Sequence, residues 1–154
     1  MTVGYLLDLL IINEVRKEKI AHKMLKEVED DLNRQNGHLL REIGKYLTEI
    51  STGNRPGTFA KHKDYDRDVN ELHEKNLIKV IHNLYLRHSE LWVLEDIRRD
   101  KSNTDEARLI AADKVSVVNK KRNDLVEQVD KIISSDLKKF KAWGELIDYR
   151  DNQP

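Results

Sequence analysis

The chain contains no cysteine, which excludes disulfide bonds, thiolate metal sites and cysteine nucleophiles. Two prolines and six glycines are few for the many tight turns of a sheet protein. Net charge is also absent, because 28 Lys and Arg residues balance 28 Asp and Glu residues. A chain without a net positive field lacks the usual basis for attracting polyanions, so we expect no nucleic-acid partner.

Long hydrophobic runs are scarce as well. The longest, VGYLLDLLII near the N-terminus, has about ten residues and contains Asp8, so it is too short and too polar to span a membrane. It lacks a basic leader and continues directly into charged sequence, unlike a signal peptide. We therefore expect a cytoplasmic protein without a membrane span.

What the chain does contain is apolar residues at steps of three and four between charged ones, a pattern typical of amphipathic helices. Its length is that of one domain, residues 1–154. The predicted fold is all-α, an antiparallel bundle of four principal helices plus a short C-terminal helix. The predicted helices span residues 3–34, 38–50, 67–99, 105–133 and 136–147, separated by Asn36-Gly37, the irregular segment 51–66, a tight turn near Ser102 and Ser134-Ser135, with residues 148–154 as a frayed tail.

The first predicted helix is apolar almost all round over its first three turns, from Leu6 to Ile12. A helix that presents apolar side chains in every direction is deeply buried or packs against another subunit. We therefore expect a homodimer through this N-terminal apolar helix.

One acidic and one basic residue occupy core-side positions of two neighbouring predicted helices. Glu95 continues the apolar stripe of residues 67–99, and Arg122 interrupts the stripe of residues 105–133. Because a buried charge without a partner costs several kcal/mol, the pattern predicts an ion pair between Glu95 or Asp96 and Arg122.

Polar residues crowd beside this predicted pair, and two interpretations stay open. Asn119, Asn123, Glu127 and Asp130 share one helix face, and Trp92 lies one turn before Glu95. They form either a buried polar layer that fixes helix register or a pocket for a polar ligand. The candidate ligand-binding residues are Trp92, Glu95, Asp96, Arg99, Asn119, Arg122, Asn123, Glu127 and Asp130.

An enzymatic alternative rests on carboxylates. Glu127 and Asp130 lie one turn apart, and Glu95 with Asp96 could oppose them to hold Mg²⁺ for phosphate chemistry. This resembles the helical nucleoside-triphosphate pyrophosphatases, although Trp92 stands where their first Glu would be. It implies a Mg-dependent nucleotide or phosphate-ester hydrolase, or a binder of a small polar ligand. No catalytic residue can be named, the six histidines lack metal-ligand spacing, and no cofactor is expected.

Two segments, LWVLEDIRR (91–99) and NKKRNDLVEQVD (119–130), resemble the bacterial domain-of-unknown-function family 4254. Ser116 and Lys120 depart from that pattern. The resemblance implies a helical fold and no particular reaction. The segment VGYLLDLLII is also similar to the start of other helical bacterial proteins, some of them associated with surface-polysaccharide genes. The leading interpretation is a non-enzymatic interaction or accessory protein, with a second copy or an unidentified protein as its partner.

Overall fold

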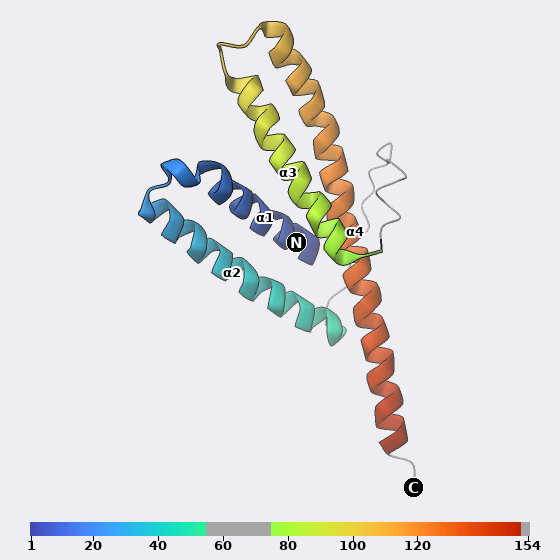
Figure 1. Ribbon diagram of the computed structural model, residues 1–154. Helices are drawn as coiled ribbons and strands as arrows, with labels where there is room; N and C mark the ends of the chain where they lie inside the picture. The colour runs from blue at the N-terminus through green and yellow to red at the C-terminus, as the bar shows by residue number, and fades with distance from the viewer. Residues whose placement is uncertain (55–74, 152–154) are drawn as a thin grey trace.

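The computed structural model describes residues 1–54 and 75–151, with side chains as far as Lys139. Within these residues the secondary structure is entirely helical, which confirms the all-α prediction. The helices are α1 (Val3–Ile20), the short 3-10 helix η1 (Ala21–Lys23), α2 (Lys26–Ser51), α3 (Leu77–Arg99) and α4 (Asp105–Asp151) (Figure 1).

The chain reverses between α1 and α2 earlier than predicted. One helix was expected as far as Arg34, yet α1 ends at Ile20 and the reversal passes through extended backbone at Met24. The physical reason lies in the buried stripe of α1, whose last fully buried member is Val15. One turn later that face carries Glu18, which is exposed, so a longer straight helix would leave the core.

Helix α2 continues through Gly37, where a helix end was predicted. A glycine inside a helix costs about 1 kcal/mol relative to alanine. Contacts on both sides of the glycine offset this cost. Leu32 and Ile43 are buried, and Asn36 bonds to α1 through both of its amide atoms, to Asn13 at 2.8 Å and to Glu14 at 2.5 Å.

The turn between α3 and α4 is as tight as predicted. Helix α3 ends at Arg99 and α4 begins at Asp105. Thr104 caps α4 by accepting a hydrogen bond from the Ala107 N–H. The predicted start of this helix, residue 67, lies outside the described residues. Within them, α3 begins directly after its cap residue Asn76.

Helix α4 is one continuous helix, so the prediction of a separate C-terminal helix from Asp136 was wrong. Ser134-Ser135 contains neither proline nor glycine, and Ser134 is itself buried. The apolar stripe also continues through this point, because Ile133 packs against two core clusters. The predicted tail, residues 148–154, falls partly within α4, and residues 152–154 are not described.

Two helical hairpins, α1/α2 and α3/α4, make up the described structure (Figure 1). Among the described helices, α1 contacts both α3 and α4, whereas α2 contacts α1 and α4 but not α3. The hairpins meet near the N-terminus and diverge toward their turns, so the four helices are not aligned along their whole length. No described helix has the length and apolarity needed to cross a membrane.

Three apolar clusters form the core of the described part of the chain. The central one joins α1 to α3 and α4 and includes Leu84 and Leu125, both fully buried. A second joins the N-terminal end of α1 to α2 around Leu6. The third lies within the α3/α4 hairpin beyond α1 and consists of Leu91, Leu94, Ala111 and Val118.

Candidate functional site

A buried carboxylate marks the place where the two hairpins meet. Asp8 of α1 is 2% exposed, and its Oδ1 lies 2.6 Å from Nε2 of His88 on α3. A carboxylate accepts, so the His88 Nε2–H is the donor. His88 is itself only 7% exposed. Because both groups are withdrawn from water, each depends on the other for its polar contact.

Arg122 of α4 completes this cluster. Its Nε lies 3.6 Å from Asp8 Oδ1, which is an ion-pair distance beyond hydrogen-bond length. Its Nη2 donates to Asn123 Oδ1 at 3.3 Å, and the side chain is 27% exposed. The Asp8 carboxylate therefore links three helices, with His88 as its close partner and Arg122 as a more distant one.

The predicted pair between Glu95 and Arg122 is wrong. Glu95 Oε2 accepts from Arg98 at 2.7 Å and lies 3.2 Å from Arg99 Nε, both on its own helix. The reason is distance along the hairpin. Glu95 lies four residues before the end of α3, whereas Arg122 lies seventeen residues after the start of α4. A difference of thirteen residues at 1.5 Å each separates them by about 20 Å along the helix axis.

The candidate residues named from the sequence fall into two groups. On α3, Trp92 and Glu95 are half-buried and Asp96 and Arg99 are exposed, all nearer the turn than the Asp8 cluster. On α4, the candidate residues lie beside that cluster or farther from the turn. Asn119, Arg122, Asn123 and Glu127 are half-buried there, and Asp130 is buried.

Asp130 has a structural partner at the start of α1. Its Oδ1 accepts from the backbone N–H of Gly4 at 2.7 Å, and so satisfies one of the amide groups that a helix N-terminus leaves open. Only glycine fits this approach, because a Cβ at Gly4 would lie 2.3 Å from the carbonyl oxygen of Val126. Thr2 caps the same helix end by accepting a hydrogen bond from the Tyr5 N–H.

Magnesium chemistry would require Glu127 and Asp130 to share one ion. In the structure Glu127 lies 3.8 Å from Lys131, and Asp130 is bonded to Gly4. Among the residues that the structure describes, no group of three or more His, Asp or Glu side chains is placed to hold a metal ion.

Sequence reasoning missed Asp8 and Gly4 as residues that position the hairpins. Asp8 did carry a signal, since a carboxylate flanked by Leu6, Leu7, Leu9 and Leu10 must be buried and therefore must find a partner. No local pattern identified His88 as that partner, because the two residues are 80 positions apart.

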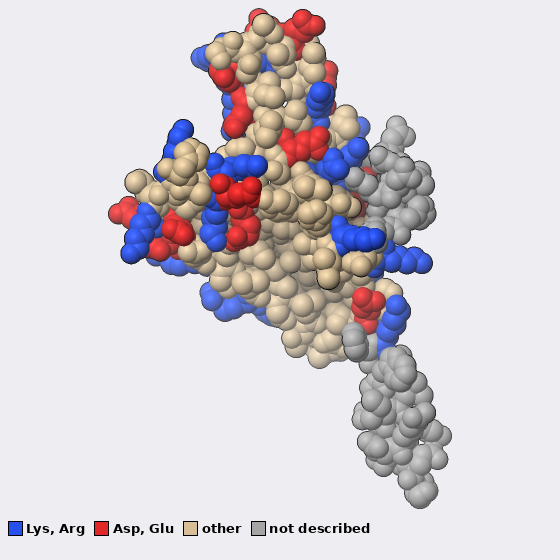
Figure 2. Space-filling view, in the orientation of Figure 1, with Lys and Arg blue, Asp and Glu red and all other residues tan. Residues whose placement is uncertain are grey.

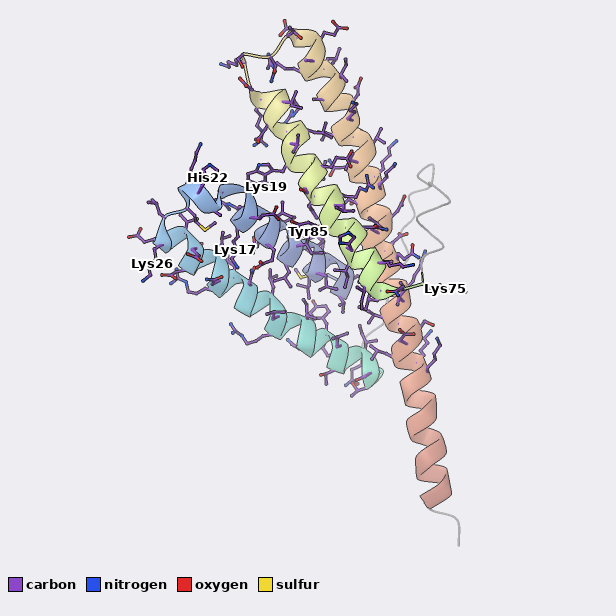
Figure 3. The ribbon with its side chains drawn as sticks, in the orientation of Figure 1. Lys17, Lys19, His22, Lys26, Lys75 and Tyr85 are labelled. Carbon is purple, nitrogen blue, oxygen red and sulfur yellow. The ribbon has the colours of Figure 1, made fainter. Side chains whose placement is uncertain are left out.

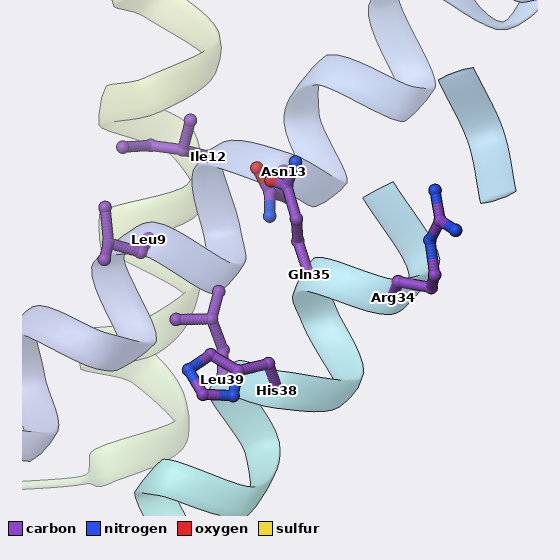
Figure 4. A pocket seen from close by; sticks show the side chains of 7 residues that line it. All are labelled: Leu9, Ile12, Asn13, Arg34, Gln35, His38 and Leu39. Carbon is purple, nitrogen blue, oxygen red and sulfur yellow. The ribbon is translucent and has the colours of Figure 1, made fainter. Parts of the chain in front are cut away.

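An apolar groove lies between α1 and α2 (Figure 4). Its volume is about 440 Å³. Leu9, Ile12 and Leu39 line it with apolar side chains, and Asn13, Arg34, Gln35 and His38 supply the polar lining. A smaller hollow of about 350 Å³ lies between the start of α3 and α4 and includes Lys75, Lys131 and Lys139.

One further bond ties the hairpins together near the C-terminal end of α1. Tyr85 of α3, labelled in Figure 3, donates its hydroxyl to the carboxylate of Glu18. Together with Asp8–His88 and Gly4–Asp130, this bond holds α1 across the α3/α4 hairpin at three points. Three points of attachment along one helix fix the angle at which it crosses the other two.

Comparison with known proteins identifies a family. No curated protein and no solved structure matches the chain. A protein family described as "Protein of unknown function (DUF4254)" matches residues 78–146, which comprise nearly all of α3 and most of α4. The segments LWVLEDIRR and NKKRNDLVEQVD both lie inside this range. The α3/α4 part of the chain therefore belongs to the DUF4254 family.

Proposed function

We propose that the protein is a non-enzymatic interaction protein that holds the apolar face of a partner helix against α1 and α2. The observation that carries this proposal is the groove of about 440 Å³, whose apolar lining comes from Leu9, Ile12 and Leu39. Figure 2 shows uncharged surface across the middle of the molecule, with charged side chains gathered around it. A hollow of this kind suits the apolar stripe of an amphipathic helix.

The outer face of α1 supports the same proposal. Tyr5, Leu9 and Ile12 follow one another at steps of four and three, so they share one side of the helix. Tyr5 is 44% exposed, whereas Leu6 and Ile11 on the other side are buried in the core of the chain. A partner helix that packs here would bury the outer stripe and the groove together.

Three of the candidate polar residues of α3 and α4 are engaged within the chain. Glu95 binds Arg98, Asp130 binds the Gly4 N–H, and Arg122 approaches Asp8 and Asn123. A catalytic site needs polar groups aimed at a substrate. These contacts favour the first of the two interpretations, a polar layer that fixes how the helices meet.

The partner in the groove is a helix of another protein or of a second copy of the chain. A homodimer through the N-terminal helix would use Tyr5, Leu9 and Ile12, because Leu6 and Ile11 already serve the core of the chain. For another protein, the similarity of the N-terminal segment to bacterial proteins associated with surface-polysaccharide genes directs the search to the products of neighbouring genes. We place this activity in the cytoplasm.

The fluorescence of anilinonaphthalene sulfonate, a dye that brightens on apolar surface, tests the groove directly. We expect binding by the native chain and its loss in the double variant Leu9→Glu/Ile12→Glu. Ile78→Glu is the matched control, because Ile78 is 79% exposed on α3 away from the groove. Circular dichroism establishes that each variant keeps its helices. Equal dye fluorescence in the native and double-variant chains would contradict the proposal.

A thermal-shift assay with Mg²⁺ and nucleotides tests the enzymatic alternative. The interaction proposal predicts no ligand-dependent stabilisation of the native chain. A stabilisation that disappears in Glu127→Gln would overturn that proposal and favour a hydrolase or a nucleotide binder.

A further inference from the structure

The α3/α4 hairpin carries a second exposed apolar surface, away from the groove. Four aliphatic side chains on it are about half exposed, Leu86 at 42%, Val93 at 50%, Ile110 at 47% and Val117 at 53%. Within each helix the two residues are seven positions apart, the repeat with which helices pack along a seam.

All four side chains lie on one side of the hairpin. Val93 directly precedes the core residue Leu94, Ile110 precedes Ala111 and Val117 precedes Val118. When two right-handed helices run in opposite directions, the residue that directly precedes a core residue points to the same side of the pair in both helices. Leu86 shares that side, because it lies seven positions before Val93. We call this surface the hairpin seam.

The hairpin seam faces away from α1. Two of the residues that contact α1 directly follow core positions instead of preceding them. Tyr85, next to Leu84, binds Glu18, and Asp130, next to Val129, binds Gly4. The seam is therefore on the opposite side of the hairpin from α1 and from the groove beside it.

Each seam residue of α3 lies at nearly the same distance from the turn as one seam residue of α4. Val93 lies six residues before the end of α3, and Ile110 lies five residues after the start of α4. Leu86 and Val117 are thirteen and twelve residues from the same points. The four side chains thus form two apolar pairs, which we call rungs. One rung, Val93 with Ile110, is nearer the turn, and the other, Leu86 with Val117, lies two helical turns farther from it.

A charged rung lies between the two apolar ones. Glu90 and Lys114 are each nine residues from the turn-side end of their helix, and each directly precedes a residue of the hairpin core, Leu91 or Val115. Both side chains are exposed, and Glu90 also pairs with Arg87 at 2.7 Å. Each helix therefore presents an apolar, a charged and an apolar residue at steps of four and three, acidic on α3 and basic on α4.

We propose that two copies of the chain dimerise through the hairpin seam, with α3 of each copy packed against α4 of the other. A two-fold axis parallel to the hairpin places Glu90 opposite Lys114 of the partner subunit, and each apolar rung opposite an apolar rung. A two-fold axis across the hairpin would instead place the two Glu90 carboxylates together, which like-charge repulsion disfavours. The charge pattern therefore selects the first arrangement, a bundle of four helices contributed by two chains.

This dimer goes beyond the interaction proposed for α1 and α2 and uses a different face of the molecule. A second copy on the seam leaves both grooves open, so one dimer would present two of them. Because the apolar part of the seam is small, we expect a dissociation constant in the micromolar range.

Sedimentation equilibrium between about 1 and 500 μM tests the dimer. We expect the native mass to rise from monomer to dimer over this range, and Val93→Glu to weaken the dimer by about tenfold or more. Leu109→Glu is the control, because Leu109 is 66% exposed on α4 one position off the seam, and it should leave the mass unchanged. A native monomer at every concentration, or equal weakening by Leu109→Glu, would overturn the proposal.

Charge reversal tests the arrangement. Glu90→Lys and Lys114→Glu should each weaken the dimer, and the two changes combined should restore it to within about threefold, because the opposed charges are exchanged but remain opposite. Failure of the combined variant to recover would refute the pairing of α3 with the partner's α4. Dye binding in the α1/α2 groove, measured on the same variants, should not change, so failure of the seam and failure of the groove are separate results.

Discussion

Replacement of Asp8 by alanine should destabilise the protein more than loss of any exposed carboxylate. The change leaves His88, 7% exposed, without its 2.6 Å partner, and leaves Arg122 without the buried carboxylate that lies 3.6 Å from its Nε. Removal of one member of a buried charged pair costs about 3 to 5 kcal/mol. Arg122 is 27% exposed and can turn to water, so we expect the lower part of that range, about 3 kcal/mol.

The measurement is urea unfolding followed by circular dichroism, with the free energy of unfolding extrapolated to water. Asp8→Asn should cost about 1 to 2 kcal/mol, because the amide oxygen still accepts from His88 while the charge is lost. Asp31→Ala is the matched control. Asp31 is exposed on α2 and binds Arg34 and Gln35, and its loss should cost about 0.5 kcal/mol or less.

A double-mutant cycle with His88→Ala isolates the pair itself. We expect a coupling energy of about 1 kcal/mol or more between Asp8 and His88, since the two side chains are in direct contact. A cost below about 1 kcal/mol for Asp8→Ala, or costs for the two single variants that simply add, would refute the view that this pair joins the hairpins.

The remaining predictions concern packing, backbone and charge. Gly4→Ala should destabilise by about 2 kcal/mol or more, because its Cβ would meet a carbonyl oxygen of α4 at 2.3 Å, whereas Gly44→Ala, with nothing within 4 Å, should stabilise by about 0.5 to 1 kcal/mol in thermal unfolding. Leu125→Ala, at a fully buried site, should cost about 2 to 5 kcal/mol in urea unfolding. The Ser102 backbone N–H lowers the pKa of Asp100 below its ordinary value, so an NMR titration of this carboxylate should give a low midpoint. The stability that this hydrogen bond contributes to the turn should be complete above the ordinary pKa and should vanish as the pH falls through the lowered pKa.

The sequence predicted secondary structure well and helix ends less well. Apolar periodicity predicted helical structure over most of the described residues. The reversal after Ile20 carries neither glycine nor proline, so no local signal marks it. Gly37 does carry such a signal, yet contacts made by Asn36 with α1 outweigh it. Tertiary packing decided both positions, and local sequence does not contain it.

For the candidate site, the apolar periodicity placed the residues on the correct helix faces but predicted the wrong ion-pair partners. Glu95 and Arg122 both lie on half-buried faces, but periodicity does not tell how far each residue lies from the turn of the hairpin. Counting residues outward from the turn does give that distance, and it places the two side chains far apart along the helix axis. Asp8 could have been recognised as a buried acid from its apolar neighbours. Its pairing with His88 required the angle at which α1 crosses α3, which only the assembled fold supplies.

The small core of the α3/α4 hairpin beyond α1 has a consequence for native-state hydrogen exchange. Leu91, Leu94, Ala111 and Val118 form the buried cluster there, and its buried members are two leucines, one valine and one alanine. Local opening of this end exposes little apolar surface, so its free energy should fall well below that of global unfolding. Amide protons near Ala111 should therefore exchange through local opening, and those near Leu84 and Leu125 only when the whole chain unfolds. Exchange near Ala111 should also slow as protein concentration rises, because a second copy on the hairpin seam would close the same surface.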